Sequence, residues 1–326
     1  MIERGVPSAD NRLLIINGSA YVEKYKPSYQ TRDVFTIWGI LQLLRLYPGK
    51  VPDLDLLFYT GDNTVIMKRH YNGLNATSPQ PLFHYCREAV ALDIVFPDWT
   101  FWGWAEVNIM PWEQMLRAIK KRRERIKWED REPYAFWKGN PTFAADRVDF
   151  LKCNLSDKND WNVRLYKQDW NKEVQKVSII LDWKINAPIE GVTWSASEKY
   201  ILACDSMTLM VKPIYYGFFS RSMVPMQHFW KIGRENKCRD LKFAAQAIGR
   251  AGSKYMEEML STRNVYDYMF HLLNEYSKLL KFKPTIAPNA RRVCAETMAC
   301  SNKGLWKEFM VQLMVISPSD KLPCAF

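Results

Sequence analysis

Apolar residues recur at helical spacing between Thr31 and Tyr47, and a short apolar run at Leu54–Tyr59 follows. The first pattern predicts an amphipathic helix that stops at Gly49, because glycine commonly ends helices. The second predicts a buried strand, and the polar segment Thr60–Thr64 after it predicts a turn. A helix, a strand and a loop are therefore expected in succession.

Two further segments show the same alternation. Tyr134–Trp137 predicts a strand that breaks at Gly139–Pro141 and is followed by a helix at about Ala144–Cys153. A helix over Ser195–Cys204 and a strand at Met207–Val211 come next. Strands that alternate with helices are typical of an α/β protein with parallel sheet, and that fold class is our prediction.

The last long pattern, Lys242–Lys281, predicts mostly helix. At roughly 150 residues per domain, the 326 residues predict about two domains. No stretch approaches the roughly 20 apolar residues of a membrane span. The first residues also lack the basic and then apolar layout of a signal peptide. We therefore expect no membrane span in this chain, and no targeting segment is visible.

The formal net charge of +11 favours an anionic partner, whether nucleic acid, phosphate or a membrane surface. Part of the excess lies in the run Lys120–Arg125, flanked by Arg117 and Lys127. A short basic run is most commonly a solvated helix face, and no nucleic-acid-binding motif accompanies it. We therefore expect no nucleic-acid partner.

The seven cysteines include no C-x-x-C pair, which removes most of the support for a metal site or thioredoxin-type chemistry. Acceptor sequons for N-glycosylation begin at Asn17, Asn75 and Asn154. Together with the cysteines they point towards the secretory pathway, and the odd count leaves at least one thiol unpaired. The alternative is a reduced cytosolic protein with small buried cysteines.

Two predicted strand–helix junctions could hold an anion. At the first, a turn through Gly139 and Asn140 brings Arg147 near the start of a helix, which suits a diphosphate; the alternative is a plain turn. At the second, Ser195-x-x-Glu198 has capping-box spacing and Lys199 lies in the first turns of the helix. A cation is unfavourable there unless it serves a bound anion; the alternative is an ordinary capped helix.

A third junction places Asp62 in the loop after a strand, where open α/β sheets bind their ligands. Asp62 is either a general base or a solvated turn aspartate. The aromatic segment Phe96–Trp104 is either core or a wall for a sugar or base. The four histidines fall in no metal or triad spacing, so we expect structural or surface roles for them.

Four segments resemble the plant Rumi-like protein O-glucosyltransferases, which carry the capsule-associated-protein domain of glycosyltransferase family 90. They are Asp93–Asn108, Tyr134–Pro141, Trp194–Ser206 and Tyr266–Tyr276. The resemblance covers nearly the whole chain from about Arg12. Runs of this length are highly specific.

The resemblance implies a GT-B-like architecture: two Rossmann-like domains facing a cleft, with C-terminal helices crossing back. We expect an acceptor-side domain at residues 1–125 and a donor-binding domain at 126–326. The family implies inverting transfer of glucose or xylose from UDP-glucose or UDP-xylose to a hydroxyl of a protein or glycan. It also implies that no metal or other cofactor is required, and a location in the ER or Golgi lumen.

By position, Asp62 matches the family's catalytic base. Ser197 stands where animal members have an arginine, and Lys199 is our candidate substitute. The implied donor-binding residues are Gly139, Asn140, Arg147, Val192, Thr193, Trp194, Ser195, Ala196, Ser197 and Lys199. The implied acceptor-side or sugar-wall residues are Asp93, Trp102, Glu106 and Asn108.

Departures from the family pattern support an alternative function. Tyr59–Asp62 retains only the last carboxylate of an acidic run that plant members carry before the base. Compared with the family pattern, the segment Val174–Ile189 is short, and roughly ten residues are absent between Phe243 and Ala247. The alternative is a catalytically impaired member that only binds nucleotide-sugar or glycan.

Overall fold

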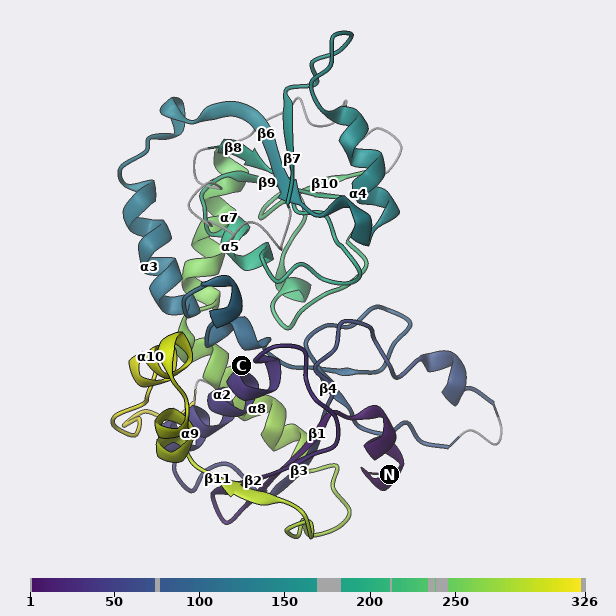
Figure 1. Ribbon diagram of the computed structural model, residues 1–326, viewed down its shortest axis with the longest axis vertical. Helices are drawn as coiled ribbons and strands as arrows, with labels where there is room; N and C mark the ends of the chain where they lie inside the picture. Colours follow the sequence, from purple (N-terminus) through teal and green to yellow (C-terminus); the bar gives the residue numbers. More distant parts are fainter. Residues whose placement is uncertain are drawn as a thin grey trace. The chain divides into compact units, whose positions relative to one another are not determined.

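The computed structural model describes residues 2–73, 77–168, 183–211, 213–233, 238 and 246–323. The chain forms two compact units (Figure 1). The first unit comprises Met1–Trp112 and Thr262–Phe326, and the second comprises Glu113–Ser261. This differs from the expected division at 125, because the chain after Ser261 belongs with the N-terminal part.

The first unit contains a six-stranded mixed sheet in the order β11-β2-β1-β3-β4-β5. β3, β4 and β5 are parallel, whereas β1 is antiparallel to both its neighbours and β11 is antiparallel to β2. The strands are β1 (Asn11–Ile16), β2 (Ser19–Lys24), β3 (Leu54–Phe58), β4 (Phe83–His84), β5 (Ile94–Val95) and β11 (Arg291–Val293).

The expectation of a parallel Rossmann-like sheet is thus wrong for half of this sheet. The reason is the two-residue turn Asn17-Gly18, whose φ angles are +49° and +71°. A turn of this kind joins neighbouring strands as a hairpin, and a hairpin makes the strands antiparallel.

Helices from both ends of the sequence pack in the first unit. Tyr276 in α8 donates a hydrogen bond of 3.0 Å to the carbonyl oxygen of Asp55 in β3. Trp102 Nε1 donates to the hydroxyl of Tyr266, also in α8. These bonds tie the C-terminal part of the chain to the N-terminal sheet. The helices of this unit are α1 (Ile2–Gly5), α2 (Arg32–Leu46), α8 (Thr262–Ser277), α9 (Ala295–Ser301) and α10 (Gly304–Gln312).

The second unit contains a five-stranded sheet, entirely parallel, in the order β10-β9-β8-β6-β7. Counted along the chain within this unit, the order is 2-1-3-4-5, which is a doubly wound arrangement. The expected parallel sheet is confirmed here. The strands are β6 (Glu132–Gly139), β7 (Val163–Lys167), β8 (Trp183–Asn186), β9 (Met207–Val211) and β10 (Trp230–Ile232).

Helices flank this sheet, as Figure 1 shows. α7 lies directly against the start of β9, because a Cβ at Gly249 would be only 2.8 Å from the carbonyl carbon of Ser206. The predicted strand–turn–helix over 134–153 is confirmed by β6, α4 and the 3₁₀ turn Leu151–Cys153. The helices are α3 (Trp112–Arg123), α4 (Ala145–Phe150), α5 (Glu198–Leu202) and α7 (Gln246–Met259).

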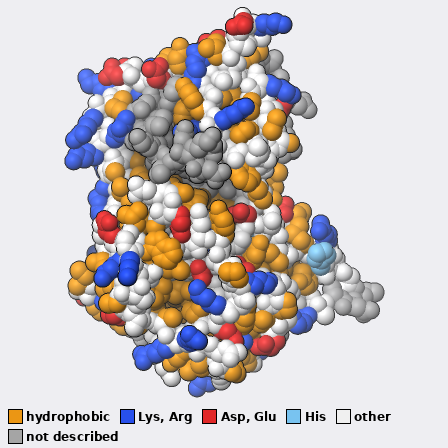
Figure 2. All heavy atoms as spheres, in the orientation of Figure 1, with side chains coloured by type: hydrophobic (Ala, Val, Ile, Leu, Met, Phe, Trp, Pro, Cys, Tyr) orange, Lys and Arg blue, Asp and Glu red, His pale blue; other side chains and the backbone are white. Residues whose placement is uncertain are grey.

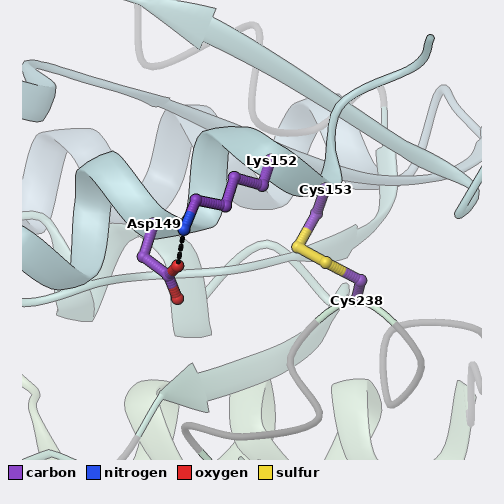
Figure 3. The surroundings of a disulfide bond; sticks show 4 residues. All are labelled: Asp149, Lys152, Cys153 and Cys238. Carbon is purple, nitrogen blue, oxygen red and sulfur yellow. Dashed lines mark hydrogen bonds and ion pairs between the residues drawn. A yellow bond between two sulfur atoms is a disulfide. The ribbon is translucent and has the colours of Figure 1, made fainter.

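A disulfide joins Cys153 to Cys238 in the second unit (Figure 3). It links the end of the α4 segment to a residue beyond β10, 85 positions later in the chain. On the helix side, Lys152 also pairs with Asp149 at 2.8 Å. The bond adds a covalent tie across the hydrophobic core of this unit.

The basic run lies on α3 and just after it, as the prediction of a helix face requires. Lys120 and Arg123 both pair with Glu257, and Arg117 pairs with Glu113 one turn away. On the face of the molecule in Figure 2, Lys and Arg side chains lie at several separate places. Among the described helices, none is long and apolar enough to cross a membrane.

Candidate functional site

The loop after β3 is held in place at nearly every residue. Buried Asp10 accepts hydrogen bonds from both the backbone N–H and the hydroxyl of Thr60, at 2.8 and 2.7 Å. The carboxylate of Asp93 accepts the N–H groups of Val65 and Ile66. This loop carries Asp62, so the backbone beside the predicted base is fixed by its surroundings.

Asp62 lies in this loop as predicted, with a side chain that is 46% exposed. Its Oδ1 accepts a hydrogen bond of 2.8 Å from Nη1 of Arg32, whose side chain is buried. In the part of the chain that the structure describes, Oδ2 of Asp62 has no hydrogen-bond partner. One carboxylate oxygen is therefore oriented by a cation, and the other is available to accept a proton.

Arg32 is held on three sides. Its Nη1 also donates to the carbonyl oxygen of Thr60 at 3.1 Å. Its guanidinium lies 4.4 Å from the ring centre of Trp99 and 5.2 Å from that of Tyr29, both within cation–π range. The position of the carboxylate of Asp62 is therefore set through a rigidly packed cation.

Arg32 was not among the site residues expected from the sequence. A signal was present, because Arg32 is the first residue of α2 and the helix dipole disfavours a cation in the first turn. A carboxylate such as Asp62 offsets that cost.

His84 contacts the backbone of the loop that carries Asp62. Its ring nitrogens lie 2.9 Å from the carbonyl oxygens of Gly61 and Cys86, and its ring is 5.3 Å from that of Tyr59. Burial lowers the pKa of this imidazole, although the two carbonyls and nearby carboxylates oppose the shift. His84 thus has the structural role that the sequence predicted, directly beneath the residue before Asp62.

The four predicted acceptor-side residues lie in different environments. Asp93 and Trp102 are buried, so a direct contact with a ligand is not supported for either. Glu106 is exposed and accepts a hydrogen bond of 2.8 Å from the hydroxyl of Thr31, the residue before Arg32. Asn108 is exposed in a left-handed conformation with φ of +53°. The structure therefore brings only Glu106 to the same helix start as the Asp62–Arg32 pair.

The aromatic segment is mostly core. Phe96, Trp99, Phe101 and Trp102 are buried, which favours the first of the two interpretations. Trp104 is half-buried, stacks edge-on against Trp99 and donates from Nε1 to Gln30 at 2.8 Å. The surface it presents is therefore small.

In the second unit, Arg147 bridges the carboxyl ends of β6 and β8. Its Nη1 donates to the carbonyl oxygen of Asn140 at 3.1 Å, and its Nη2 donates to that of Ile189 at 2.8 Å. Its Nε is shared between the carbonyls of Ile189 and Glu190. β6 and β8 are adjacent strands at which the strand order reverses, and doubly wound sheets bind ligands at the carboxyl ends of such strands.

Among the described residues, the charge of Arg147 has no counter-ion nearby. Across the described ranges its contacts are backbone carbonyls and the ring of Trp137, with no carboxylate. Burial lowers the pKa of the guanidinium, and no acid opposes that shift. A partly buried cation in this position suits an anionic ligand.

The turn beside Arg147 is shaped by close contacts. A Cβ on Gly139 would lie 2.6 Å from the ring of Trp137, and a Cβ on Gly191 would lie 3.0 Å from Nη2 of Arg147. Asn140 accepts the N–H and hydroxyl of Thr142 through Oδ1. Glycine at 191 therefore leaves the space that the guanidinium occupies.

The loop before α5 differs from its prediction. α5 begins at Glu198 with Ser197 as its N-cap, and the side chain of Ser197 makes no capping hydrogen bond. Instead the hydroxyls of Ser195 and Ser197 bond to each other at 2.8 Å, and Glu198 donates its N–H to the carbonyl of Ser195. The capping-box prediction is wrong, because the helix begins too late for Ser195 to cap it.

The remaining predicted donor-binding residues lie in the loop before α5 and in the first turn of that helix. Val192 is 42% exposed, Thr193 is buried, and Trp194 and Ala196 are half-buried. Lys199 is buried, with Nζ 3.3 Å from the carbonyl oxygen of Ala196 and 4.7 Å from the ring centre of Tyr200. A cation is thus present directly beneath the 195–197 turn.

The described residues contain no cluster of three or more His, Cys, Asp or Glu side chains that could hold a metal ion.

The sequence profile of glycosyl transferase family 90 matches residues 1–326. The chain therefore belongs to this family. It is 26% identical over 278 residues to the O-glucosyltransferase rumi of Drosophila melanogaster, covering 75% of this chain and 65% of that protein. It is 22% identical over 264 residues to Protein O-glucosyltransferase 1 of Homo sapiens, covering 73% and 65% of the two chains.

The matched region spans about 65% of the length of these relatives. The resemblance to Rumi-like proteins is confirmed by them.

Proposed function

We propose that this protein is an inverting glycosyltransferase that moves glucose or xylose from UDP-glucose or UDP-xylose to a hydroxyl of a protein or glycan. The observation that carries the proposal is Arg147, a cation without a carboxylate partner among the described residues, at the reversal point of the parallel sheet in a family-90 chain. The names of the relatives, which are O-glucosyltransferases, support the reaction class.

The donor diphosphate would bind at the carboxyl ends of β6 and β8. Arg147 and backbone N–H groups of the 192–197 loop would neutralise it, with Lys199 beneath that loop adding positive charge. Gly139 and Asn140 would form the floor of the turn. The proposal requires no metal ion, because these groups supply the charge that the leaving UDP needs.

The acceptor hydroxyl would bind beside Asp62. A serine or threonine hydroxyl is a poor nucleophile at neutral pH, so a base must take its proton during attack. In the proposed step the proton passes to Oδ2 of Asp62 and the hydroxyl oxygen bonds to C1 of the sugar. The bond from C1 to the UDP oxygen breaks on the opposite face, which inverts the configuration. Arg32 positions Asp62 and is not itself in contact with the reacting atoms.

The domain roles follow from these residues. Asp62 lies in the first unit and Arg147 in the second. We retain the proposal of a GT-B architecture with an acceptor-side and a donor-binding domain, and assign the acceptor side to the first unit and the donor side to the second, in place of the bounds 1–125 and 126–326 expected from the sequence. The C-terminal helices, which pack in the first unit, would then be part of the acceptor side.

The proposed location is the lumen of the ER or Golgi. The disulfide between Cys153 and Cys238 supports an oxidising compartment, because structural disulfides are rare in the reducing cytosol. The names of the relatives do not state a location, so the proposed location rests on the disulfide.

The experiment is a donor screen with purified protein. UDP release is measured for UDP-glucose, UDP-xylose, UDP-galactose and UDP-N-acetylglucosamine, with serine- and threonine-containing peptides as acceptors and without acceptor. We expect release with one of the first two donors, faster when the acceptor is present. Absence of UDP binding by calorimetry in folded protein would overturn the proposal.

One observation favours a second candidate, a member that binds donor or glycan without transfer. The loop at Tyr59–Asp62 keeps a single carboxylate. Of the two segments that are short relative to the family, Val174–Ile189 and Phe243–Ala247, residues 174–182 and 243–245 lie outside the described residues. UDP binding without transfer to any acceptor in the screen would favour this candidate.

A further inference from the structure

The turn between β1 and β2 carries a sequon that the proposed function does not use. Asn17 and Gly18 form the turn of this hairpin, Ser19 is the first residue of β2, and Asn17 is exposed. Its backbone N–H donates to Asp53 Oδ1 at 2.7 Å, which fixes the turn. Its side-chain amide makes no hydrogen bond to any residue that the structure describes.

A second sequon gives a contrast. The side chain of Asn154 is half-buried and bonds to the backbone of Leu165 on both sides: Nδ2 donates to its carbonyl at 3.3 Å and Oδ1 accepts from its N–H at 3.0 Å. A glycan on Nδ2 would break this pairing. The third sequon begins at Asn75, which lies outside the described residues.

We propose that Asn17 is an N-glycosylation site of this protein, and that Asn154 is not. The inference rests on the lumenal location proposed above, which the disulfide between Cys153 and Cys238 supports. The co-reactant is an oligosaccharide attached through a diphosphate to a lipid carrier. The amide nitrogen of Asn17 bonds to C1 of the first sugar and loses a proton, and the lipid diphosphate leaves.

The fold accommodates a glycan at this position. The sheet register pairs Asn11 with Phe58, at the end of β1 that faces the start of the Asp62 loop. Asn17 follows the other end of β1, and five strand steps of about 3.4 Å separate the two ends by about 17 Å. A glycan on Asn17 is therefore attached beyond the end of β1 that lies away from the proposed base.

The sequon hydroxyl is also accessible when it is needed. In the folded protein Ser19 accepts a long hydrogen bond of 3.4 Å from Arg292. Arg292 lies in β11, 273 residues away in the sequence, and a hydrogen bond of this length is weak, so it holds the Ser19 hydroxyl only loosely.

The test is the mass of the secreted protein. The 326-residue chain, directed into the secretory pathway of yeast by an added cleavable leader, is purified and weighed before and after treatment with an endoglycosidase. We expect a glycan on the peptide that contains Asn17, which is absent in Asn17→Gly and in Ser19→Ala and persists in Asn154→Gln. Glycine suits the positive φ at position 17, so the turn is retained.

The overturning result is an unmodified Asn17 in protein whose peptide map contains the Cys153–Cys238 disulfide. That outcome leaves the proposed function untouched, because the protein reached an oxidising compartment and the donor screen is separate. A glycan on Asn154 would also overturn the inference. Failure of UDP binding with Asn17 glycosylated would instead count against the proposed function alone.

Discussion

Arg32 Nη1 lies 2.8 Å from Oδ1 of Asp62, so the first residue of α2 is paired with the loop after β3. The pair joins two segments that are 30 residues apart in the sequence. It gives a buried arginine at a helix N-terminus a counter-charge, and it fixes the direction of a half-exposed carboxylate. Both residues of the pair are therefore expected to influence transfer, in different ways.

Replacement of Asp62 by Asn removes the basicity and keeps the shape of the side chain. General-base assistance contributes typically about 10²–10⁴-fold, so sugar transfer should fall by at least about 100-fold. UDP affinity should stay near the wild-type value, because Asp62 lies in the other unit from Arg147. Transfer rates and UDP titration calorimetry measure the two quantities.

The matched control for this variant is Asp93→Asn. Asp93 is buried and accepts two backbone N–H groups, so its loss should lower the free energy of unfolding. If transfer survives in Asp62→Asn and collapses in a folded Asp93→Asn protein, the base has been assigned to the wrong carboxylate.

Replacement of Arg32 by Ala should slow transfer through the position of Asp62. A misplaced reacting group can cost on the order of 10²-fold, so we expect about 10–100-fold lower kcat with UDP affinity unchanged. Arg45→Ala is the control, because Arg45 also forms an ion pair from α2, with Glu296 at the opposite end of the helix. Equal losses in the two variants would indicate damage to the helix and contradict the positioning role.

Replacement of Arg147 by Ala should weaken UDP binding by about 1.5–3 kcal/mol, the range for a hydrogen bond to a charged group. Arg164→Ala is the matched control, because Arg164 lies in the same sheet but pairs with Asp160 on the surface. Gly191→Ala should also weaken binding, since the added Cβ would press on Nη2 of Arg147. Unchanged affinity in a folded Arg147→Ala protein would remove Arg147 from the donor site.

The pH dependence of stability should report on His84. Burial lowers its pKa in the folded protein below the ordinary value of 6.5. As the pH falls below about 6.5, the imidazole of His84 is protonated in the unfolded chain before it is protonated in the folded protein. The contribution of His84 to the free energy of unfolding, which is fully present above about pH 6.5, is therefore lost as the pH falls towards the folded-state pKa. Urea unfolding from pH 8 to pH 5 should show this loss, and His84→Gln should reduce it. His70→Gln, at an exposed position, should retain the full loss.

Loss of the disulfide should destabilise the second unit. Removal of a native disulfide typically costs about 2–5 kcal/mol, and the 85-residue separation here closes a long loop. The double variant Cys153→Ser, Cys238→Ser should lower the thermal unfolding midpoint, because the unfolded chain is no longer constrained by the cross-link. Cys204→Ser is the control, because Cys204 is a buried free thiol in the same unit. An equal effect of the two changes would mean that packing and not the cross-link is responsible.

Local patterns in the sequence determined much of the fold. The spacing of apolar residues located α2, β3, β6, α4 and β9 close to their observed bounds, because burial of one face imposes a period on the residues of each element. The same patterns placed Asp62 directly after a strand. The resemblance of long segments identified the family, which the match over residues 1–326 confirms.

Tertiary structure decided what depends on pairing between distant segments. The hairpin at Asn17-Gly18 and the antiparallel pairing of β1 with β3 and of β11 with β2 made the first sheet mixed, and apolar periodicity carries no information about strand direction. The ion pair between Arg32 and Asp62 and the hydrogen bond from Arg147 to Ile189 likewise join residues far apart in the chain. The burial of Asp93 and Trp102 also depends on distant segments that pack over them. Such contacts arise from the packing of whole elements, so the spacing of residues within any one element could not reveal them.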